Sequence, residues 1–414
     1  HTFFGLQPVG HPDLRPLHLH ENWPENAHPL RKEYPWNMRP PKVLGSYEFH
    51  KVSGDGIYEI PVGPVHAGII EPGHFRFSVA GEEIIMLEPR LGYVHKGSEK
   101  LFEIKTTSEA IKLSERISGD SSYNHSLAFC QALEAISKTQ VSSRARYLRV
   151  FFAELERIAN HLNDIGFMML DTGFTFGGSQ CARLREKVLQ INERIGGNRF
   201  LRGVNALGGV TKDIIEEDKQ KIPAELKYFK DDFREIMEIA SQSAILLNRL
   251  KETGILENSV AHDHGVVGVV ARASGIECDS RIDFSYAAYP ELECVKVIEK
   301  DGDVYARFMV RTKEVENSIH LIEQVLLKIP SGPLMSDAKR MQADSYAVGI
   351  AEGWRGEIIY FIATDEVGNL SRVKVRDPSF LNWAAVPYAA KGNVVPDFPL
   401  INKSFNLSYS GNDL

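Results

Sequence analysis

The longest regular pattern in this chain is an apolar stripe between residues 143 and 171. Apolar residues return there at steps of three and four positions, which is the period of an amphipathic helix. The stripe consists of Tyr147, Val150, Phe151, Leu155, Ile158, Leu162 and Ile165. A helix this apolar needs partner helices, and the periodic runs at 180–195, 225–252 and 315–329 can supply them. The pattern predicts an antiparallel helix bundle, preceded by shorter helices at 108–117 and 124–137.

Alternation of apolar and polar residues, the period of a half-buried strand, occurs near both ends of the chain. Residues 74–89, HFRFSVAGEEIIMLEP, alternate on both sides of Gly81, which favours a hairpin. Residues 356–366 and 370–377 form a second candidate pair around Gly368, followed by a short helix at 381–390. Together the patterns predict an α+β fold, mainly α, with a helix-bundle core and small β-sheet elements near the N- and C-termini.

Three segments lack a lasting period. Residues 1–42 are rich in proline and histidine and predict an extended arm, which leaves residues 43–414 as the main domain. Residues 259–311 predict a loop with short strands, and the tail after Val394 predicts turns. Because the chain begins with His1 rather than Met, we expect a further segment upstream of it.

The composition narrows the class of protein. Of the 414 residues, 43% are hydrophobic and 25% are charged, which is enough for a large buried core. The net charge of -7 argues against a nucleic-acid partner. No stretch reaches the roughly 20 consecutive apolar residues that cross a bilayer, so any membrane association must go through other subunits. The four scattered cysteines form no Cys-x-x-Cys pair, which argues against a disulfide framework and fits a reducing, cytoplasmic setting.

Two histidine-bearing stretches are candidates for chemistry. In GPVHAGIIEPGH, residues 63–74, proline and glycine fix an irregular backbone that could present His66 to a cavity. On spacing alone, a loop with two solvated histidines explains this stretch better. On the long helix, His161 and Asp164 are three positions apart and share one face. A buried, paired His and Asp could relay a proton, whereas a polar flank facing water explains the same spacing.

A third constellation joins ERISGDSSYNHS, residues 115–126, with NLSYSGNDL at the C-terminus. Serine and glycine cannot act as the soft anionic ligands that nickel or an iron cluster requires. The local chemistry is therefore hydroxyl hydrogen bonding and close approach of the backbone, and both stretches alone are turn signals. The chain has no G-x-S-x-G elbow and no Walker loop, so a serine hydrolase and direct nucleotide binding have no support.

Taken together, the motifs resemble a known family: the large subunits of membrane-bound, energy-converting nickel-iron hydrogenases and the quinone-site subunit of respiratory complex I, the NADH-quinone oxidoreductase. The resemblance runs along nearly the whole chain. It rests, in order, on GPVHAGIIEPGHFRF, RLGYVHKGSEKLFE, ERISG followed by YNHS, ELERIANHLNDIG, LRGVNALGGV, GVVARASGIECDSR, RGE and RVKVRDPSFLNW. The arm is similar to the end of the adjacent subunit of complex I, in GHPDLRPL and HPLRKEYP, which implies a fused chain.

In the hydrogenases of this family, two Cys-x-x-Cys pairs hold nickel and iron. The matching positions here are Ser118, Ser121, Ser408 and Gly411. Because the thiolates bind such a centre through their softness and charge, the resemblance implies that this chain binds no metal.

The complex I members of the family use the same cavity for a quinone head group. The resemblance therefore implies a quinone-like cavity at the four replaced positions, together with Gly119 and Tyr123. The quinone-binding tyrosine of the family falls near Gly119, so the resemblance implies that one donor to the head group is missing. Ser118, Ser121 or Tyr123 could substitute for it.

The function implied by the resemblance is that of a peripheral-arm subunit in a membrane-bound oxidoreductase complex, at the cytoplasmic face of the cell membrane. His66 and Asp171 match the residues beside the quinone, and His161 is a third candidate for a polar role. The chain would bind no cofactor other than a quinone, and electrons would come from a 4Fe-4S cluster in an iron-sulfur small subunit. Membrane ion-translocating subunits and other peripheral-arm subunits are the further expected partners.

Two other interpretations stay open. One is a scaffold without redox function, which a cavity filled by Tyr123 or Tyr409 would favour over a quinone-sized space. The other is an active nickel-iron hydrogenase, which predicts bound nickel. Three arginines could stabilise negative charge near the cavity, although structural ion pairs are the more common use of this residue. They are Arg76, Arg116 and Arg157.

Overall fold

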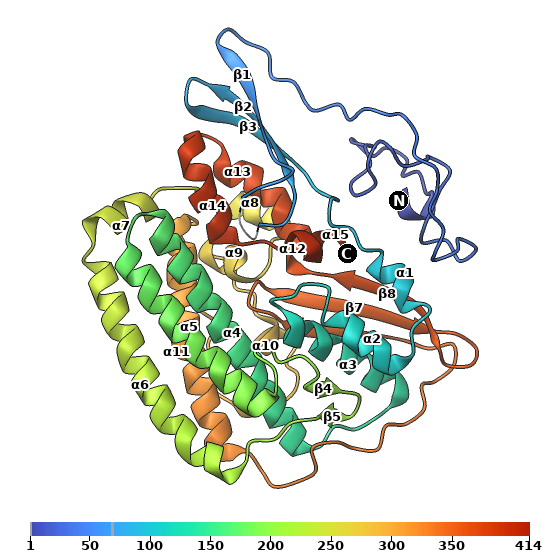
Figure 1. Cartoon of the computed structure of the whole chain (residues 1–414), viewed down its shortest axis with the longest axis vertical. Coiled ribbons are helices and arrows are strands. Elements are labelled where there is room, and N and C mark those ends of the chain that lie inside the picture. The colour runs from blue at the N-terminus through green and yellow to red at the C-terminus, as the bar shows by residue number, and fades with distance from the viewer. Residues whose placement is uncertain (1, 68–69) are drawn as a thin grey trace.

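A computed structural model describes residues 2–67 and 70–414 and shows a helix bundle beside two small sheets (Figure 1). The bundle consists of α4 (Ser143–Asp171), α5 (Thr175–Gly196), α6 (Glu216–Ser241) and α11 (Val304–Lys328). The central helix, α4, has the predicted bounds, because Ser142 caps it by accepting the Ala145 N–H and its apolar stripe is buried. The predicted α+β fold with a helix-bundle core is confirmed.

Several predicted helices have other bounds in the structure, and capping side chains explain two of the differences. The run at 225–252 is two helices, because α6 ends at Ser241 and Ser243 caps the separate α7 (Ala244–Leu250). The predicted helix at 315–329 begins earlier, at Val304, where Asp303 caps α11 by accepting the Ala306 N–H. In both cases a capping side chain, rather than the apolar period, sets the boundary.

The prediction for residues 259–311 was wrong. All of these residues are described, and none of them lies in a strand. Short helices occupy the segment instead: α8 (Asn258–Asp263), α9 (Gly268–Ala273), α10 (Ser280–Asp283) and the 3-10 helix η2 (Tyr289–Glu291). Helices this short contain too few turns to show an apolar period.

Two three-stranded antiparallel sheets lie near the two ends of the chain, as predicted. The first has the order β1 (Ile57–Val62), β2 (His74–Ala80) and β3 (Glu83–Arg90). The second has the order β6 (Tyr346–Glu352), β7 (Glu357–Thr364) and β8 (Leu370–Arg376), of which β6 was not predicted. A two-stranded ladder pairs β4 (Asn205–Ala206) with β5 (Gly209–Val210).

The second sheet supports α3 (Ser122–Ser137), the helix that follows the ERISGD stretch. Strand β6 approaches α3 so closely that a Cβ on Gly349 would lie 1.9 Å from the Ala128 carbonyl oxygen. Glycine at this position therefore permits the contact between helix and sheet. Two short helices precede α3, namely α1 (Ser98–Phe102) and α2 (Thr107–Ser114).

The C-terminal tail is helical, contrary to the predicted turns. It contains α14 (Phe398–Phe405) and α15 (Tyr409–Asp413), preceded by α12 (Pro378–Asn382), α13 (Val386–Ala390) and the 3-10 helices η3 (Trp383–Ala385) and η4 (Val395–Asp397). The turn signals of the sequence are the ends of these helices. Asn406 has a positive φ of 44° after α14, and Ser408 caps α15.

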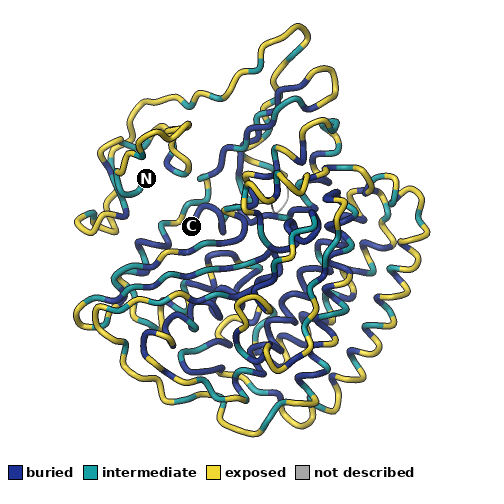
Figure 2. The backbone as a smooth tube through the Cα atoms, turned by 180° about the vertical axis from the view of Figure 1, so that it is seen from behind, coloured by how far each residue is buried: buried dark blue, intermediate teal, exposed yellow. Residues whose placement is uncertain are grey.

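The N-terminal arm begins with the 3-10 helix η1 (Thr2–Phe4) and is otherwise irregular and largely exposed (Figure 2). Arg90 at the end of β3 binds the arm to the first sheet, because its guanidinium donates hydrogen bonds to the carbonyl oxygens of Pro16, Leu17 and Leu19. His18 bonds the Asn412 carbonyl near the C-terminus at 3.0 Å. Among the described residues, no helix has the length and apolar character to span a membrane.

Candidate functional site

The four positions that match the family's cysteines lie close together. Ser118 precedes α3, whereas Ser408 begins α15, yet their hydroxyl oxygens lie 2.9 Å apart across 290 positions of sequence. The Ser408 hydroxyl also accepts the Gly411 N–H at 2.9 Å. All three serines, Ser118, Ser121 and Ser408, are buried. The fold thus brings together the segment before α3 and the C-terminal segment. The site that they form, Ser118, Ser121, Ser408 and Gly411, is the cradle.

A guanidinium from this chain lies beside these hydroxyls. Arg355, between β6 and β7, forms a bidentate ion pair with Asp120, with N–O distances of 2.7 and 2.8 Å. Its Nη1 also lies 3.4 Å from the Ser118 oxygen and 3.5 Å from that of Ser121, and its Nε donates to the Asn406 carbonyl. Burial alone would raise the pKa of Asp120, but the charge of Arg355 holds it below its ordinary value.

The residues present do not fit a nickel-iron centre. Three neutral hydroxyls replace thiolates, and the adjacent guanidinium would repel a metal cation. A side chain at the fourth position has no room, because a Cβ on Gly411 would lie 2.5 Å from the Asp377 carboxylate. In the part of the chain that the structure describes, no group of three His, Cys, Asp or Glu residues is placed to hold a metal ion.

A buried triad next to the cradle was not predicted. His125 in α3 bonds the Asp377 carboxylate through Nε2 at 3.0 Å and the Tyr360 hydroxyl through Nδ1 at 2.9 Å. Burial raises the pKa of Asp377, but the hydrogen bond from His125 and the charge of Arg355 bring it below its ordinary value. The signal for this triad was present in two of the family motifs, YNHS and RVKVRD, but 252 positions separate its His and Asp.

His66 and Asp171 are not joined by a hydrogen bond within the described residues. His66 is half-buried, and its Nε2 lies 2.7 Å from the Gly73 carbonyl oxygen. Asp171 is exposed at the end of α4. Protein atoms around its carboxyl group remove part of its hydration and so raise its pKa, whereas the charge of Lys403 lowers it. The loop that carries His66 lies against Tyr409, because a Cβ on Gly73 would be 2.4 Å from this ring.

Gly119 and Tyr123 are the two remaining candidates for the quinone-like cavity. In the sequence they come just before and just after the start of α3. Gly119 is exposed, and its carbonyl accepts a hydrogen bond from the Ser122 hydroxyl at 2.8 Å. Tyr123 is fully buried, and its hydroxyl donates to the Arg149 carbonyl of α4 at 3.3 Å. The Tyr123 hydroxyl is therefore already engaged with the bundle.

His161 is paired, although not with Asp164. Its Nε2 lies 2.7 Å from the Glu314 carboxylate of α11, whereas Asp164 pairs with Arg311 at 2.8 Å. The hypothesis of a His161–Asp164 pair is therefore wrong, because α11 offers both residues closer partners. Burial lowers the pKa of His161. Burial raises that of Glu314, but Arg272 and His161 bring it well below its ordinary value.

A network of buried charges extends from Glu314 through the molecule. Arg272 of α9 bridges Glu314, at 2.7 Å, and Glu352 of β6, at 2.8 Å. Arg157 of α4 pairs with Glu154 at 3.2 Å and lies 3.5 Å from Glu314. Arg157 therefore forms structural ion pairs, which is the more common use of an arginine. Arg76 pairs with Glu59, and Arg116 donates to the Lys112 carbonyl of its own turn.

Glu156 differs from these buried carboxylates because, among the described residues, no cation forms a salt bridge with it. It accepts the backbone N–H groups of Tyr123 and Asn124 and the Asn124 side-chain amide, at 2.6, 3.2 and 2.6 Å. Burial raises the pKa of Glu156 to about 7. Glu156 and Asp120 both line one small cavity, which places this carboxyl group close to the cradle.

The chain is similar in sequence to known proteins along most of its length. Residues 171–347 and 341–413 match the family model of the respiratory-chain NADH dehydrogenase, 49 Kd subunit, and residues 1–40 match that of the 30 Kd subunit. The chain is 34% identical to formate hydrogenlyase subunit 5 of Escherichia coli (strain K12), over 99% of this chain and 73% of the relative. It is 33% identical to an NADH-quinone oxidoreductase subunit of Clostridium beijerinckii, over 81% of this chain and 91% of the relative.

A solved structure has the same fold. It is a chain of the membrane-bound sulfane sulfur reductase, an archaeal respiratory membrane complex, with a TM-score of 0.81 and 26% sequence identity. The match covers 87% of this chain and 99% of that chain.

Proposed function

Because this chain belongs to the family of the 49 Kd subunit of respiratory-chain NADH dehydrogenase, we propose that it passes electrons from a partner's iron-sulfur cluster to an acceptor without a metal of its own. Its relatives are subunits of membrane-bound respiratory and energy-converting complexes, and the chain fits a peripheral-arm subunit of such a complex. The proposed partners are an iron-sulfur small subunit with a 4Fe-4S cluster, membrane ion-translocating subunits and other peripheral-arm subunits. The proposed location is the cytoplasmic face of the membrane.

The observation that carries this proposal is the Arg355–Asp120 ion pair among the serines at the thiolate positions. A fixed cation and hydroxyl donors can stabilise negative charge on a reduced acceptor, which is the electrostatic part of such a reaction. They cannot store electrons, so the electrons must come from a neighbouring subunit. The match of residues 1–40 to the 30 Kd family supports the division into an arm, 1–42, and a main domain, 43–414.

The proposed acceptor is a quinone. Two electrons from the cluster and two protons convert it to the quinol, and we assign the proton-donating roles to His66 and Asp171. His161 has a supporting role in this proposal, because Glu314 and the buried charge network hold it. Ser118, Ser121, Ser408 and the backbone at Gly411 and Gly119 form the polar wall of the site, and Tyr123 lies behind it.

Two observations favour other functions. The close packing of Tyr409 against Gly73 favours a scaffold without redox function, because this ring takes up space next to the His66 loop. The likeness to a chain of the sulfane sulfur reductase, together with the polar lining around Arg355, favours a small anionic sulfur acceptor over an apolar ring.

The test is electron transfer by the purified intact complex, assayed with a soluble quinone and with a sulfane sulfur compound. We expect quinone reduction that falls at least about tenfold in the His66→Ala variant, as for loss of a positioned proton donor. The control is His262→Ala, since His262 is 81% exposed. Quinone turnover that is equal in both variants contradicts the role of His66. Turnover with sulfane sulfur alone supports the anionic acceptor, and turnover with neither supports the scaffold.

A further inference from the structure

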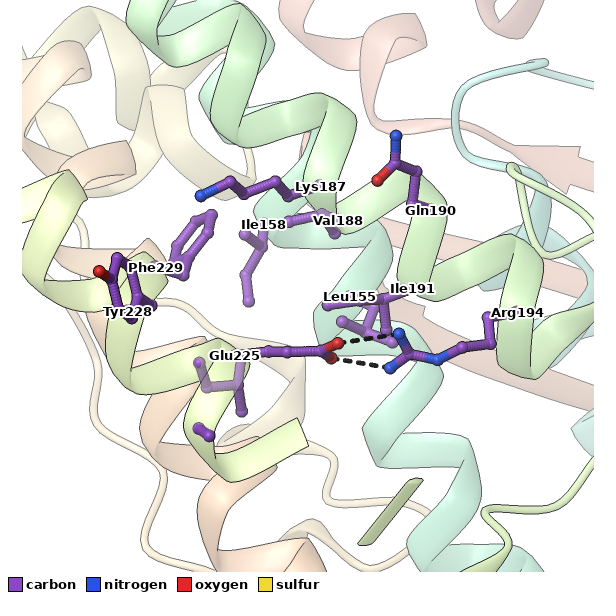
Figure 3. Close-up of a pocket in the computed structure, with 12 residues that line it drawn as sticks. Leu155, Ile158, Lys187, Val188, Gln190, Ile191, Arg194, Glu225, Tyr228 and Phe229 are labelled. Carbon is purple, nitrogen blue, oxygen red and sulfur yellow. Dashed lines mark hydrogen bonds and ion pairs between the residues drawn. The ribbon is translucent and has the colours of Figure 1, made fainter. Parts of the chain in front are cut away.

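A second cavity lies in the helix bundle, formed by α4, α5 and α6 (Figure 3). Its volume is about 420 Å³, within the range of pockets that hold small molecules. Six apolar side chains from the three helices form its floor and walls, and all six are buried. They are Leu155, Ile158, Val188, Ile191, Leu226 and Phe229.

The sequence of α6 explains why this space stays open. Ala224 lines it on the α6 side, and its methyl group is too short to reach the apolar floor. An apolar cavity offers water no hydrogen-bond partners, so water is held there weakly and an apolar molecule can replace it. The cavity therefore suits a hydrocarbon group.

The two ends of the opening differ in charge. At one end, Arg194 pairs with Glu225 at 2.9 and 2.7 Å and with Asp218 at 3.0 Å, so carboxylates outnumber the cation. At the other end, Lys187 and Arg183 share one carboxylate, that of Asp232, at 3.4 and 3.0 Å.

Lys187 is the cation that borders the cavity at this second end. Figure 3 shows its side chain extended along the opening toward Tyr228 and Phe229, and its ammonium lies 5.9 Å from the centre of the Tyr228 ring. Within residues 2–67 and 70–414, Asp232 pairs with both Lys187 and Arg183, so one positive charge at this end has no carboxylate of its own there. An anionic group is thus favoured here and disfavoured at the Glu225 end.

We propose that this cavity binds a long-chain fatty acid, with the hydrocarbon chain between α5 and α6 and the carboxylate beside Lys187. The apolar floor accounts for the chain, and the surplus cation accounts for the head group. This proposal does not rest on the redox function proposed above, because the cavity lining shares the helix α4 with that site but includes none of the residues around Arg355.

The test is a titration of the full-length chain, in detergent-free buffer, with the fluorescent fatty acid cis-parinaric acid. We expect saturable binding of one molecule per chain. Ala224→Trp should weaken it at least about tenfold, because displacing two buried methylenes already has that effect. Ala224 is exposed, so this change does not overpack the core, and Ala224→Ser is the matched control with unchanged binding.

The charged end is tested by competition. After correction for the affinity of the probe, which carries a carboxylate itself, Lys187→Met should raise the inhibition constant of palmitate about fivefold and leave that of hexadecanol unchanged. Lys227→Met is the control, since Lys227 is an exposed lysine of α6 outside the cavity lining. Binding that does not saturate, or that Ala224→Trp leaves unchanged, overturns the proposal.

Two further outcomes also overturn it. Equal weakening of acid and alcohol by Lys187→Met removes the argument for a carboxylate. Binding to the isolated chain but not to the intact complex shows that a neighbouring protein of the complex covers the cavity.

Discussion

Removing the guanidinium of Arg355 tests the ion pair that replaces the metal centre. In Arg355→Leu the protein loses two hydrogen bonds to Asp120, of 2.7 and 2.8 Å, and one to the Asn406 carbonyl. Breaking a buried ion pair by removing one partner costs about 3–5 kcal/mol. The Asp120 side chain is 42% exposed, so water can solvate the carboxylate that remains. We therefore expect a loss of about 2–3 kcal/mol in the free energy of unfolding.

The assay is urea unfolding of the purified chain, followed by tryptophan fluorescence. Trp354 is a local probe, because the Arg355 guanidinium lies 3.9 Å from the centre of its ring. Arg234→Leu is the matched control, since Arg234 forms an exposed pair with Glu316 at 3.0 Å and should cost less than about 1 kcal/mol. A loss for Arg355→Leu within about 0.5 kcal/mol of this control would refute the reasoning.

Three further changes probe the surroundings of the cradle. Glu156→Gln removes a carboxyl whose pKa is raised to about 7, so the wild type loses stability as the pH rises through that value. Relative to wild type, the variant should gain about 3 kcal/mol in urea unfolding between about pH 4 and pH 8, and a constant difference contradicts this. Gly411→Ala should cost about 1–3 kcal/mol through the contact with Asp377, whereas Gly119→Ala, which meets only Arg202 at 3.5 Å, should be near neutral. Glu314→Gln should cost about 3–5 kcal/mol, because it removes a buried carboxylate that Arg272, Arg157 and His161 share and leaves Arg272 with Glu352 alone; a cost below about 1 kcal/mol contradicts the account.

The parts of the fold that could be predicted are those with a long, regular period. Helix α4 and the hairpin β2–β3 lie where their patterns indicate, because in each of them the apolar period runs along the whole element. The short helices α9 and α10 were missed, and they carry Arg272 and Arg281, two cations of the buried network. Their conformation depends on these ion pairs, which no local pattern records.

The candidate site also has a part that the sequence predicted and a part that it did not. Ser118, Ser121 and Ser408 were found through motifs, and the fold brings them together. The ion pair between Asp120 and Arg355 spans 235 positions and was not predicted, since no spacing in the sequence indicates that two charges will meet. The prediction of Asp164 as the partner of His161 was wrong for the same reason, because the observed partner, Glu314, lies 153 positions away in the sequence. The roles of His66 and Asp171 stay predictions.

The most direct test of the central claim is the nickel content of the purified, active complex, measured by mass spectrometry of the metal. With three hydroxyls, a glycine and a guanidinium in place of four thiolates, we predict nickel far below one atom per chain in a preparation that still reduces its acceptor. One nickel atom per chain, lost together with activity when a chelator removes it, would contradict the account.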